Sequence, residues 1–336
     1  MSLLRVFKSS DKSKSTKGTD IFSEEFIKKL EKLRFIVKKI LFSGTVGEQI
    51  MRQKGGRLEF AGHRDYTPGD ETRYIDWNAF ARLERLYIKE FSQEKSIPLY
   101  ILLDISISML SSNIQIPARL DDASRSGGPA RLRSGGDVIS KIDYVRQLAA
   151  ALGYIGLITG QPVRLFASSH NSFYKSKIFE SDKQLFEMMT FLRKLKAEGQ
   201  TNIYDACTKF DKTINKKGFF ILLSDLFENR GEDSHRILER LNNKGFIINI
   251  MHISSGFDES PPLSGLYRLR DSESGEEKVV WIDNKTISTY QHTFSSFSEG
   301  WNSFCLKHNI KYFYLNTRTS LEDVVFRLLR QRGLLR

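Results

Sequence analysis

Apolar residues recur every three or four positions between residues 23 and 41, which is the spacing of one face of an α-helix. Ser23 stands where an N-cap is expected, and five lysines lie on the opposite face. We expect the apolar face to pack against the chain's own core, with binding of this basic helix to an anionic membrane surface as the alternative. The apolar positions are Phe26, Ile27, Leu30, Leu33, Ile36, Val37, Ile40 and Leu41.

Further along the chain, strand and helix patterns alternate. Two uninterrupted apolar runs, 97–103 and 219–223, are typical of strands that are buried on both faces of a parallel sheet. The alternation predicts an α/β domain over 96–336 with a doubly wound, mostly parallel sheet. The other expected elements are strands at 163–167, 246–253 and 310–315, a hairpin over 266–283, and helices from 139 to near 160 and at 184–195, 204–214, 234–243, 290–308 and 320–329.

Three stretches differ in composition from this domain. Residues 1–22 are rich in Lys, Ser and Thr, so we expect a disordered basic tail. Residues 23–95 hold the first helix and a turn-rich segment, which we interpret as a small irregular module with short strands. Residues 111–136 are rich in Gly, Ser and Arg and contain PARL twice, so we expect a disordered insertion, with a functional loop as the alternative.

Charge and cysteine content indicate where in the cell the protein is expected. Lys and Arg outnumber Asp and Glu by 52 to 40, and residues 1–40 hold eleven basic and five acidic side chains. The chain has two cysteines, which suits a reducing compartment, and no run approaches the roughly 18 apolar residues of a membrane-spanning helix. We therefore expect a cytoplasmic protein, with peripheral contact to the inner face of the membrane through the basic helix as a further option.

Small oxygen-bearing residues follow the predicted strands. Asp104, Ser106 and Ser108 come directly after the first apolar run, and the alternation should place all three on one side of an extended turn. Thr201 opens a helix, and Asp225 follows the second apolar run. Because the carboxyl ends of parallel strands meet at one edge of a sheet, these residues should lie together. Hydroxyls and carboxylates without His or Cys suit Mg²⁺ or Mn²⁺ and disfavour zinc.

This arrangement resembles the von Willebrand factor A fold with its metal-ion-dependent adhesion site. The resemblance implies direct coordination by Ser106, Ser108 and Thr201, with Asp104 and Asp225 contacting the ion largely through water. A cation whose inner ligands are mostly neutral keeps much of its charge. The resemblance therefore implies an open coordination position that accepts an acidic residue of a partner.

A second set of motifs covers more of the chain: EF at 59–60, RDYTPGD at 64–70, RYIDW at 73–77, AR at 81–82, EF at 90–91, Glu94, and RD at 270–271 with ESGE at 273–276. These motifs resemble the signature of domain-of-unknown-function family 58, whose members combine such a module with a von Willebrand A-like domain. Many members are encoded beside MoxR-type AAA+ ATPases. The resemblance therefore implies an adaptor or co-factor of such an ATPase.

Eight polar and aromatic residues of the small module form a second candidate site. Six are charged, with three of each sign within nineteen residues, so they can form an ion-pair network that holds the module onto the sheet. A partner-binding surface is the alternative. The residues are Arg64, Asp65, Tyr66, Asp70, Arg73, Asp76, Trp77 and Arg82.

Three functions from different classes remain. We expect a non-enzymatic, metal-dependent interaction protein that docks an acidic residue of a partner. A Mg²⁺-dependent phosphohydrolase is a weaker alternative, because no histidine lies in the three metal loops, the DxSxS motif lacks the second Asp of a DxD loop, and no GxxxxGK[ST] loop occurs. Nucleic-acid or membrane-surface binding would explain the basic charge, but no recognised nucleic-acid motif accompanies it.

Overall fold

The computed structural model describes residues 20–42, 59–67, 70–72, 75–92, 96–113, 139–228, 231–261, 263–270 and 277–330. The chain divides into two compact units, a larger one from Met1–Arg34 and Ile97–Arg336 and a smaller one from Phe35–Ser96. The expected basic tail up to residue 19 and the expected insertion from residue 114 lie outside the described residues.

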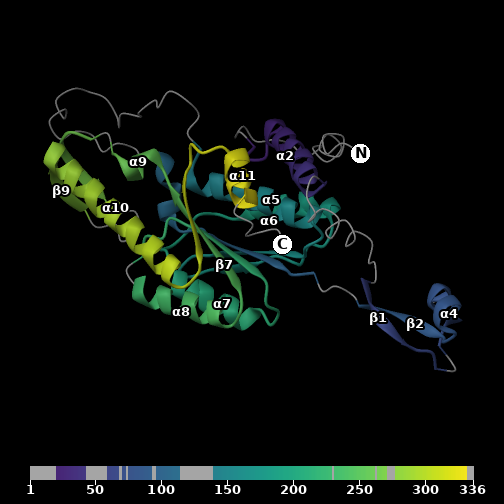
Figure 1. Cartoon of the computed structure of the whole chain (residues 1–336). Coiled ribbons are helices and arrows are strands. Elements are labelled where there is room, and N and C mark those ends of the chain that lie inside the picture. Colours follow the sequence, from purple (N-terminus) through teal and green to yellow (C-terminus); the bar gives the residue numbers. More distant parts are fainter. Residues whose placement is uncertain are drawn as a thin grey trace. The chain divides into compact units, whose positions relative to one another are not determined.

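A six-stranded sheet forms the centre of the larger unit (Figure 1). The strand order is β10-β7-β6-β3-β4-β5, and every neighbouring pair is parallel except β4 with the edge strand β5. The expected doubly wound, mostly parallel α/β fold is therefore confirmed. The strands are β3 Leu99–Asp104, β4 Val163–Ser168, β5 Phe173–Lys175, β6 Phe219–Ser224, β7 Ile247–Ser254 and β10 Lys311–Asn316.

Helices cover both faces of this sheet, which is why β3 and β6 are buried along their whole length. Figure 1 shows α7, α8 and α10 on one side and α5, α6 and α11 on the other. The helices are α5 Lys141–Ile158, α6 Leu185–Lys194, α7 Ile203–Thr213, α8 Gly231–Asn243, α10 Asn284–Lys307 and α11 Leu321–Arg330; shorter turns are η2 Ile107–Asn113, η4 Asp182–Gln184 and α9 Gly256–Glu259.

Aromatic packing fills the layer beneath α7. Phe210 is fully buried, and its ring centroid lies 4.5 Å from that of Phe220 and 5.2 Å from that of Phe166. Tyr100 and Phe246 approach the same ring at 5.5 and 5.6 Å. Strands β3, β4 and β6 therefore share one aromatic cluster, which fixes the position of α7 on the sheet.

The helix α10 begins six residues earlier than the expected start at Tyr290. Asp283 caps it by accepting the backbone N–H of Thr286 at 2.7 Å. The first half of α10 is largely exposed. The buried residues of the helix, Trp301 and Cys305, lie in its second half. The expected start was therefore too late, because the apolar spacing marks only the half that packs against the sheet.

In the first helix, α2 Glu24–Phe42, the expected apolar positions whose side chains the structure describes are buried. Ile27, Leu30 and Leu33 have no exposed surface, and Ser23 accepts the N–H of Phe26 at 3.3 Å. The contact division runs through this helix, so that residues up to 34 belong with the sheet, whereas the boundary expected from sequence lies at residue 23. Among the described helices, none is both long enough and apolar enough to cross a bilayer.

Two hairpins complete the description. In the larger unit, β8 Gly265–Arg270 pairs antiparallel with β9 Glu277–Ile282, at the expected place. In the smaller unit, β1 Glu59–Asp65 pairs antiparallel with β2 Tyr87–Ser92, and the helix α4 Trp77–Leu83 lies between them in the chain. The expected short strands of the small module are thus present.

Candidate functional site

The loops that carry the predicted metal ligands are joined by backbone hydrogen bonds at the carboxyl end of β3. The N–H of Ile107 donates to the carbonyl of Gly199 at 2.9 Å, and the N–H of Glu198 donates to the carbonyl of Ile105 at 2.8 Å. Gly199 has a φ of 67°, a conformation that favours glycine. These bonds bring Thr201 next to the loop after β3, although the two lie far apart in the sequence.

The three predicted hydroxyl ligands lie in contact. The Ser106 Oγ is 2.8 Å from the Ser108 Oγ, and the Thr201 hydroxyl donates to the Ser106 Oγ at 2.9 Å. The third separation, from Ser108 Oγ to Thr201 Oγ1, is 3.4 Å. Neighbouring ligands of an octahedral Mg²⁺, each about 2.1 Å from the ion, are about 3.0 Å apart. The hydroxyls therefore fit one triangular face of a Mg²⁺ or Mn²⁺ coordination shell.

One local expectation is wrong. The alternation of small and apolar residues predicted an extended turn, whereas residues from Ile107 onward form the 3₁₀ turn η2. The N–H of Met109 donates to the carbonyl of Ser106 at 3.1 Å and closes this turn. The hydroxyls of Ser106 and Ser108 still meet, because the turn folds the chain back within three residues.

Asp104 is buried and receives a hydrogen bond on each carboxylate oxygen. Its Oδ1 accepts the N–H of Ser106 at 2.9 Å, and its Oδ2 accepts the hydroxyl of Ser224 at 2.6 Å. Burial and the nearby charge of Asp225 raise the pKa of Asp104 to about 7. The carboxyl group therefore holds the loop after β3 against the end of β6, and a cation beside it would favour the ionised form.

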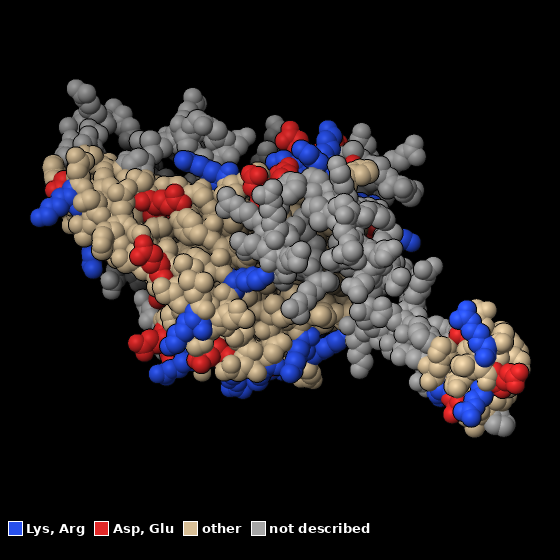
Figure 2. Space-filling model, in the orientation of Figure 1, with Lys and Arg blue, Asp and Glu red and all other residues tan. Residues whose placement is uncertain are grey.

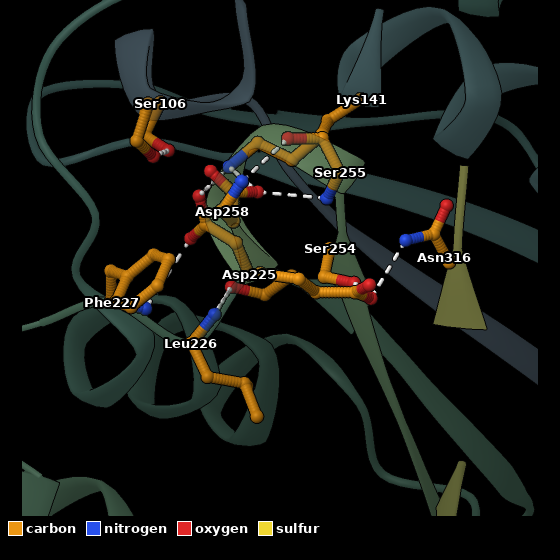
Figure 3. A network of polar contacts seen from close by, with 12 residues as sticks. Ser106, Lys141, Asp225, Leu226, Phe227, Ser254, Ser255, Asp258 and Asn316 are labelled. Atoms are coloured by element: carbon orange, nitrogen blue, oxygen red, sulfur yellow. Dashed lines mark hydrogen bonds and ion pairs between the residues drawn. The ribbon is translucent and has the colours of Figure 1, made fainter. Parts of the chain in front are cut away.

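Asp225 has no exposed surface and forms an ion pair. The Lys141 Nζ donates to its Oδ2 at 2.9 Å, and the N–H of Phe227 donates to its Oδ1 at 3.3 Å. The same ammonium lies 3.2 Å from the Oδ2 of Asp258, in the short helix α9. Figure 3 shows Lys141 between the two carboxylates.

Sequence reasoning missed Lys141, Asp258 and the role of Ser224. Lys141 is 1% exposed, although lysine is among the residues most often found at the surface. A signal existed in the sequence, because Lys141 is four residues before Val145 and seven before Leu148, in line with the apolar stripe of α5. Asp258 gives no comparable signal, since it lies outside any periodic element.

Donor chemistry at this site favours a hard cation. The described residues contain no cluster of three or more His, Cys, Asp or Glu side chains suited to a metal. The division expected from the resemblance, with hydroxyl oxygens as inner ligands and Asp104 and Asp225 behind them, stays a prediction. Mg²⁺ and Mn²⁺ prefer such oxygen donors.

The second candidate set lies in the smaller unit and forms local contacts. Arg64 donates to both carboxylate oxygens of Asp70, at 2.7 and 2.6 Å, and this pairing lowers the pKa of Asp70 to about 2. Asp76 caps α4 by accepting the N–H groups of Asn78 and Ala79, and it also lies 2.8 Å from the Nε2 of His63. These contacts tie Asp70 and the start of α4 to residues of β1.

Other members of this set have different roles. Trp77 is 59% exposed at the start of α4, and Arg82 is exposed in its last turn. Asp65 ends β1, and the N–H of Tyr66 donates to the carbonyl of Leu86 at 2.9 Å. Arg73 lies outside the described residues. Their assignment to an interdomain or partner contact stays a prediction.

Among the described residues on the face that Figure 2 draws, both basic and acidic side chains are present. Figure 2 shows Lys and Arg interspersed with Asp and Glu around the larger unit. Several charges of the larger unit are paired, as where Asp211 lies 2.6 Å from Lys244 and 3.3 Å from Arg240. Such pairs reduce the field that a polyanion would meet near them.

Comparisons with known proteins give one family and several distant structures. The model of the family described as "Protein of unknown function DUF58" matches residues 62–117 and 128–296. No curated protein matches the chain.

Three solved structures illustrate the structural likeness. BatB from Bacteroides thetaiotaomicron is 14% identical, with a TM-score of 0.42 over 70% of this chain and 98% of that one. An aerotolerance-related membrane protein from Bacteroides fragilis is 13% identical, with a TM-score of 0.42 over 70% and 100%. The vWF domain of the pili tip protein Mfa5 from Porphyromonas gingivalis is 13% identical, with a TM-score of 0.30 over 71% and 97%.

Proposed function

This chain belongs to the DUF58 family, and from that premise we propose that it is a non-enzymatic protein-interaction module that docks an acidic residue of a partner on a bound divalent cation. The partner we propose is a MoxR-type AAA+ ATPase or another protein with an exposed acidic residue. Ser106, Ser108 and Thr201 would hold Mg²⁺ or Mn²⁺ directly, with Asp104 and Asp225 behind them.

The observation that carries this proposal is the spacing of the three hydroxyls, at 2.8, 2.9 and 3.4 Å. Neutral hydroxyl ligands leave a divalent cation with most of its charge, and the bound cation would then attract a carboxylate from outside the chain. The chain's own contribution is to hold these oxygens at one edge of a rigid sheet. Backbone bonds between the loops of Ile105 and Gly199 provide that rigidity.

The same residues support a role without catalysis. A nucleophilic serine needs an adjacent base, and hydrolysis by a metal-bound water needs a positioned proton acceptor. The hydroxyls of Ser106, Ser108 and Thr201 contact one another, and Asp104 is engaged by Ser106 and Ser224. No Ser–His or Cys–His pair occurs among the five proposed ligand residues.

Calorimetry with MgCl₂ and MnCl₂ tests the metal site, comparing the full chain with Asp104→Ala. We expect saturable binding by the wild type and at least roughly tenfold weaker binding by the variant, because second-shell partners alone contribute that much to metal affinity. Circular dichroism of both proteins checks that the variant is folded. Equal affinity in the two proteins would contradict the site.

Affinity capture from host lysate then tests docking, with wild type in Mg²⁺, wild type in EDTA and Asp104→Ala as three parallel samples. Mass spectrometry identifies the retained proteins. We expect an AAA+ ATPase, or another protein with an exposed acidic segment, only in the first sample. Neutralising the acidic residue of that protein should abolish its retention. The same proteins in all three samples would refute docking through the metal.

A further inference from the structure

Lys141 is the most buried cation near the candidate site. Its side chain is 2% exposed, and its ammonium forms ion pairs with Asp225 at 2.9 Å and Asp258 at 3.2 Å. The Nζ also lies 5.7 Å from the centre of the Phe227 ring. Burial opposes the charge of Lys141, but the two carboxylates outweigh this effect and raise its pKa. The ammonium is therefore charged and held in one place.

The position of this lysine is unfavourable for the helix that carries it. Lys141 is the first residue of α5, after the N-cap Ser140. The N-terminus of a helix carries a partial positive charge, so a cation there is destabilising. Burying an ammonium is also costly unless it is paired. Both unfavourable contributions to stability are offset if Lys141 neutralises the buried carboxylates of Asp225 and Asp258.

Further hydrogen bonds hold both carboxylates in place, so the position of the paired ammonium is fixed as well. Asp258 accepts the N–H of Ser255 at 2.8 Å, and the Ser255 hydroxyl accepts the N–H of Asp258 at 3.3 Å in return. Figure 3 shows this capping pair on one side of the ammonium and Asp225 on the other. The site thus contains a cation supplied by the chain, directly behind a proposed metal residue.

The formal charges of Lys141 and the nearby carboxylates indicate how Lys141 would change the affinity of the site for a metal ion. Lys141 pairs with the carboxylates of Asp225 and Asp258, and the charge of Asp225 also acts on Asp104. The ammonium therefore offsets part of the negative charge that a cation beside Asp225 would meet. Without Lys141, a divalent cation would meet more uncompensated negative charge there and would bind more strongly.

We propose that Lys141 is a built-in counter-cation, which keeps this edge of the sheet folded when no metal is bound and lowers the affinity of the site for Mg²⁺. This inference rests on the proposed metal site. A lower affinity makes the bound ion exchangeable, so that occupancy, and with it the docking of an acidic partner, would follow the available Mg²⁺.

The test measures Mg²⁺ affinity by calorimetry and melting temperature in EDTA for the full chain. For Lys141→Met, we expect the melting temperature in EDTA to fall by roughly 10 °C, because two buried carboxylates lose their partner. We expect Mg²⁺ to bind at least about tenfold more tightly, because the repelling charge is gone. Lys141→Arg keeps the charge and should stay close to the wild type in affinity.

Asp258→Asn provides an independent test if Lys141→Met does not fold. This change removes one negative charge without touching a proposed ligand, and Asn can still accept the N–H of Ser255. We expect Mg²⁺ affinity to fall roughly tenfold. In the double variant Lys141→Met/Asp258→Asn, the formal charge returns to that of the wild type, and the affinity should return toward the wild-type value.

Two results would overturn the inference. Weaker Mg²⁺ binding by Lys141→Met would mean that Lys141 orients Asp225 for the metal instead of competing with it. Unchanged affinity in both Lys141→Met and Asp258→Asn, with normal binding by the wild type, would refute the role of Lys141 alone. If neither the wild type nor Lys141→Met binds Mg²⁺ or Mn²⁺, the proposed metal site fails as well.

Discussion

Replacing Thr201 by Val tests the hydroxyl cluster with little change in shape. In the absence of metal, the variant loses the hydrogen bond from Thr201 to Ser106 and the longer contact of 3.4 Å with Ser108, and Ser106 keeps its contact with Ser108. One neutral hydrogen bond contributes about 1 kcal/mol, which corresponds to about 2–4 °C in the melting temperature of a domain of this size. We therefore expect Thr201→Val to melt about 2–4 °C below the wild type in EDTA, and we call this difference in melting temperature the deficit.

The deficit should grow in saturating Mg²⁺, because the variant also lacks one of three inner ligands. A tenfold loss of affinity adds about 1.4 kcal/mol, so the gap in melting temperature should roughly double. Differential scanning calorimetry in EDTA and in Mg²⁺ measures both gaps. Thr201→Ser, which keeps a hydroxyl, should behave much more like the wild type.

Thr213→Val is the matched control for this experiment. The Thr213 hydroxyl donates to the carbonyl of Lys209 at 2.7 Å, at the end of α7 opposite Thr201. The control loses one hydrogen bond and touches none of the clustered hydroxyls, so its deficit should be the same in EDTA and in Mg²⁺. If the deficit of Thr201→Val is likewise independent of Mg²⁺, the hydroxyl does not bind the ion and the reasoning from the oxygen spacing is refuted.

Three further predictions concern the fold around the site. Phe210→Ala should lower the free energy of unfolding by about 3–5 kcal/mol in urea titrations, because it empties the aromatic cluster; a change below 1 kcal/mol would contradict the packing. Gly218→Ala should be destabilising by about 1–3 kcal/mol, since a Cβ would lie 2.3 Å from the carbonyl oxygen of Pro98. Gly300→Ala should instead be stabilising by up to about 1 kcal/mol, because a Cβ there would have nothing within 4 Å and alanine favours a helix. In EDTA, the stability of the wild type relative to Asp104→Asn should decline as the pH rises from about 4 to 7. The pKa of Asp104 is raised from its ordinary value of 3.8 to about 7 in the folded protein, so the folded form holds a proton that the unfolded form releases. A stability difference that does not change with pH would argue against a raised pKa.

The continuous apolar runs were sufficient to predict the centre of the fold. Strands such as Leu99–Asp104 and Phe219–Ser224 are buried on both faces, so every position before the polar last residue is apolar or aromatic and the pattern is hard to mistake. The order of strands and helices then places the ends of these strands at one edge. For that reason the cluster of Ser106, Ser108 and Thr201 could be predicted from small polar residues at strand ends.

Long-range contacts decided the rest, because a sequence pattern reports local periodicity and not what a side chain meets across the fold. For the N-terminal helix, the sequence left the packing of the apolar face open, and only the tertiary structure shows that Leu30 and Leu33 are buried in the core. Lys141 and Asp225 are 84 residues apart, and although the apolar stripe hints that Lys141 is buried, no local pattern identifies its partner. The tertiary structure alone turned an apparently ordinary helix-start lysine into a buried counter-ion, because its charge is tolerable only where two fixed carboxylates meet it.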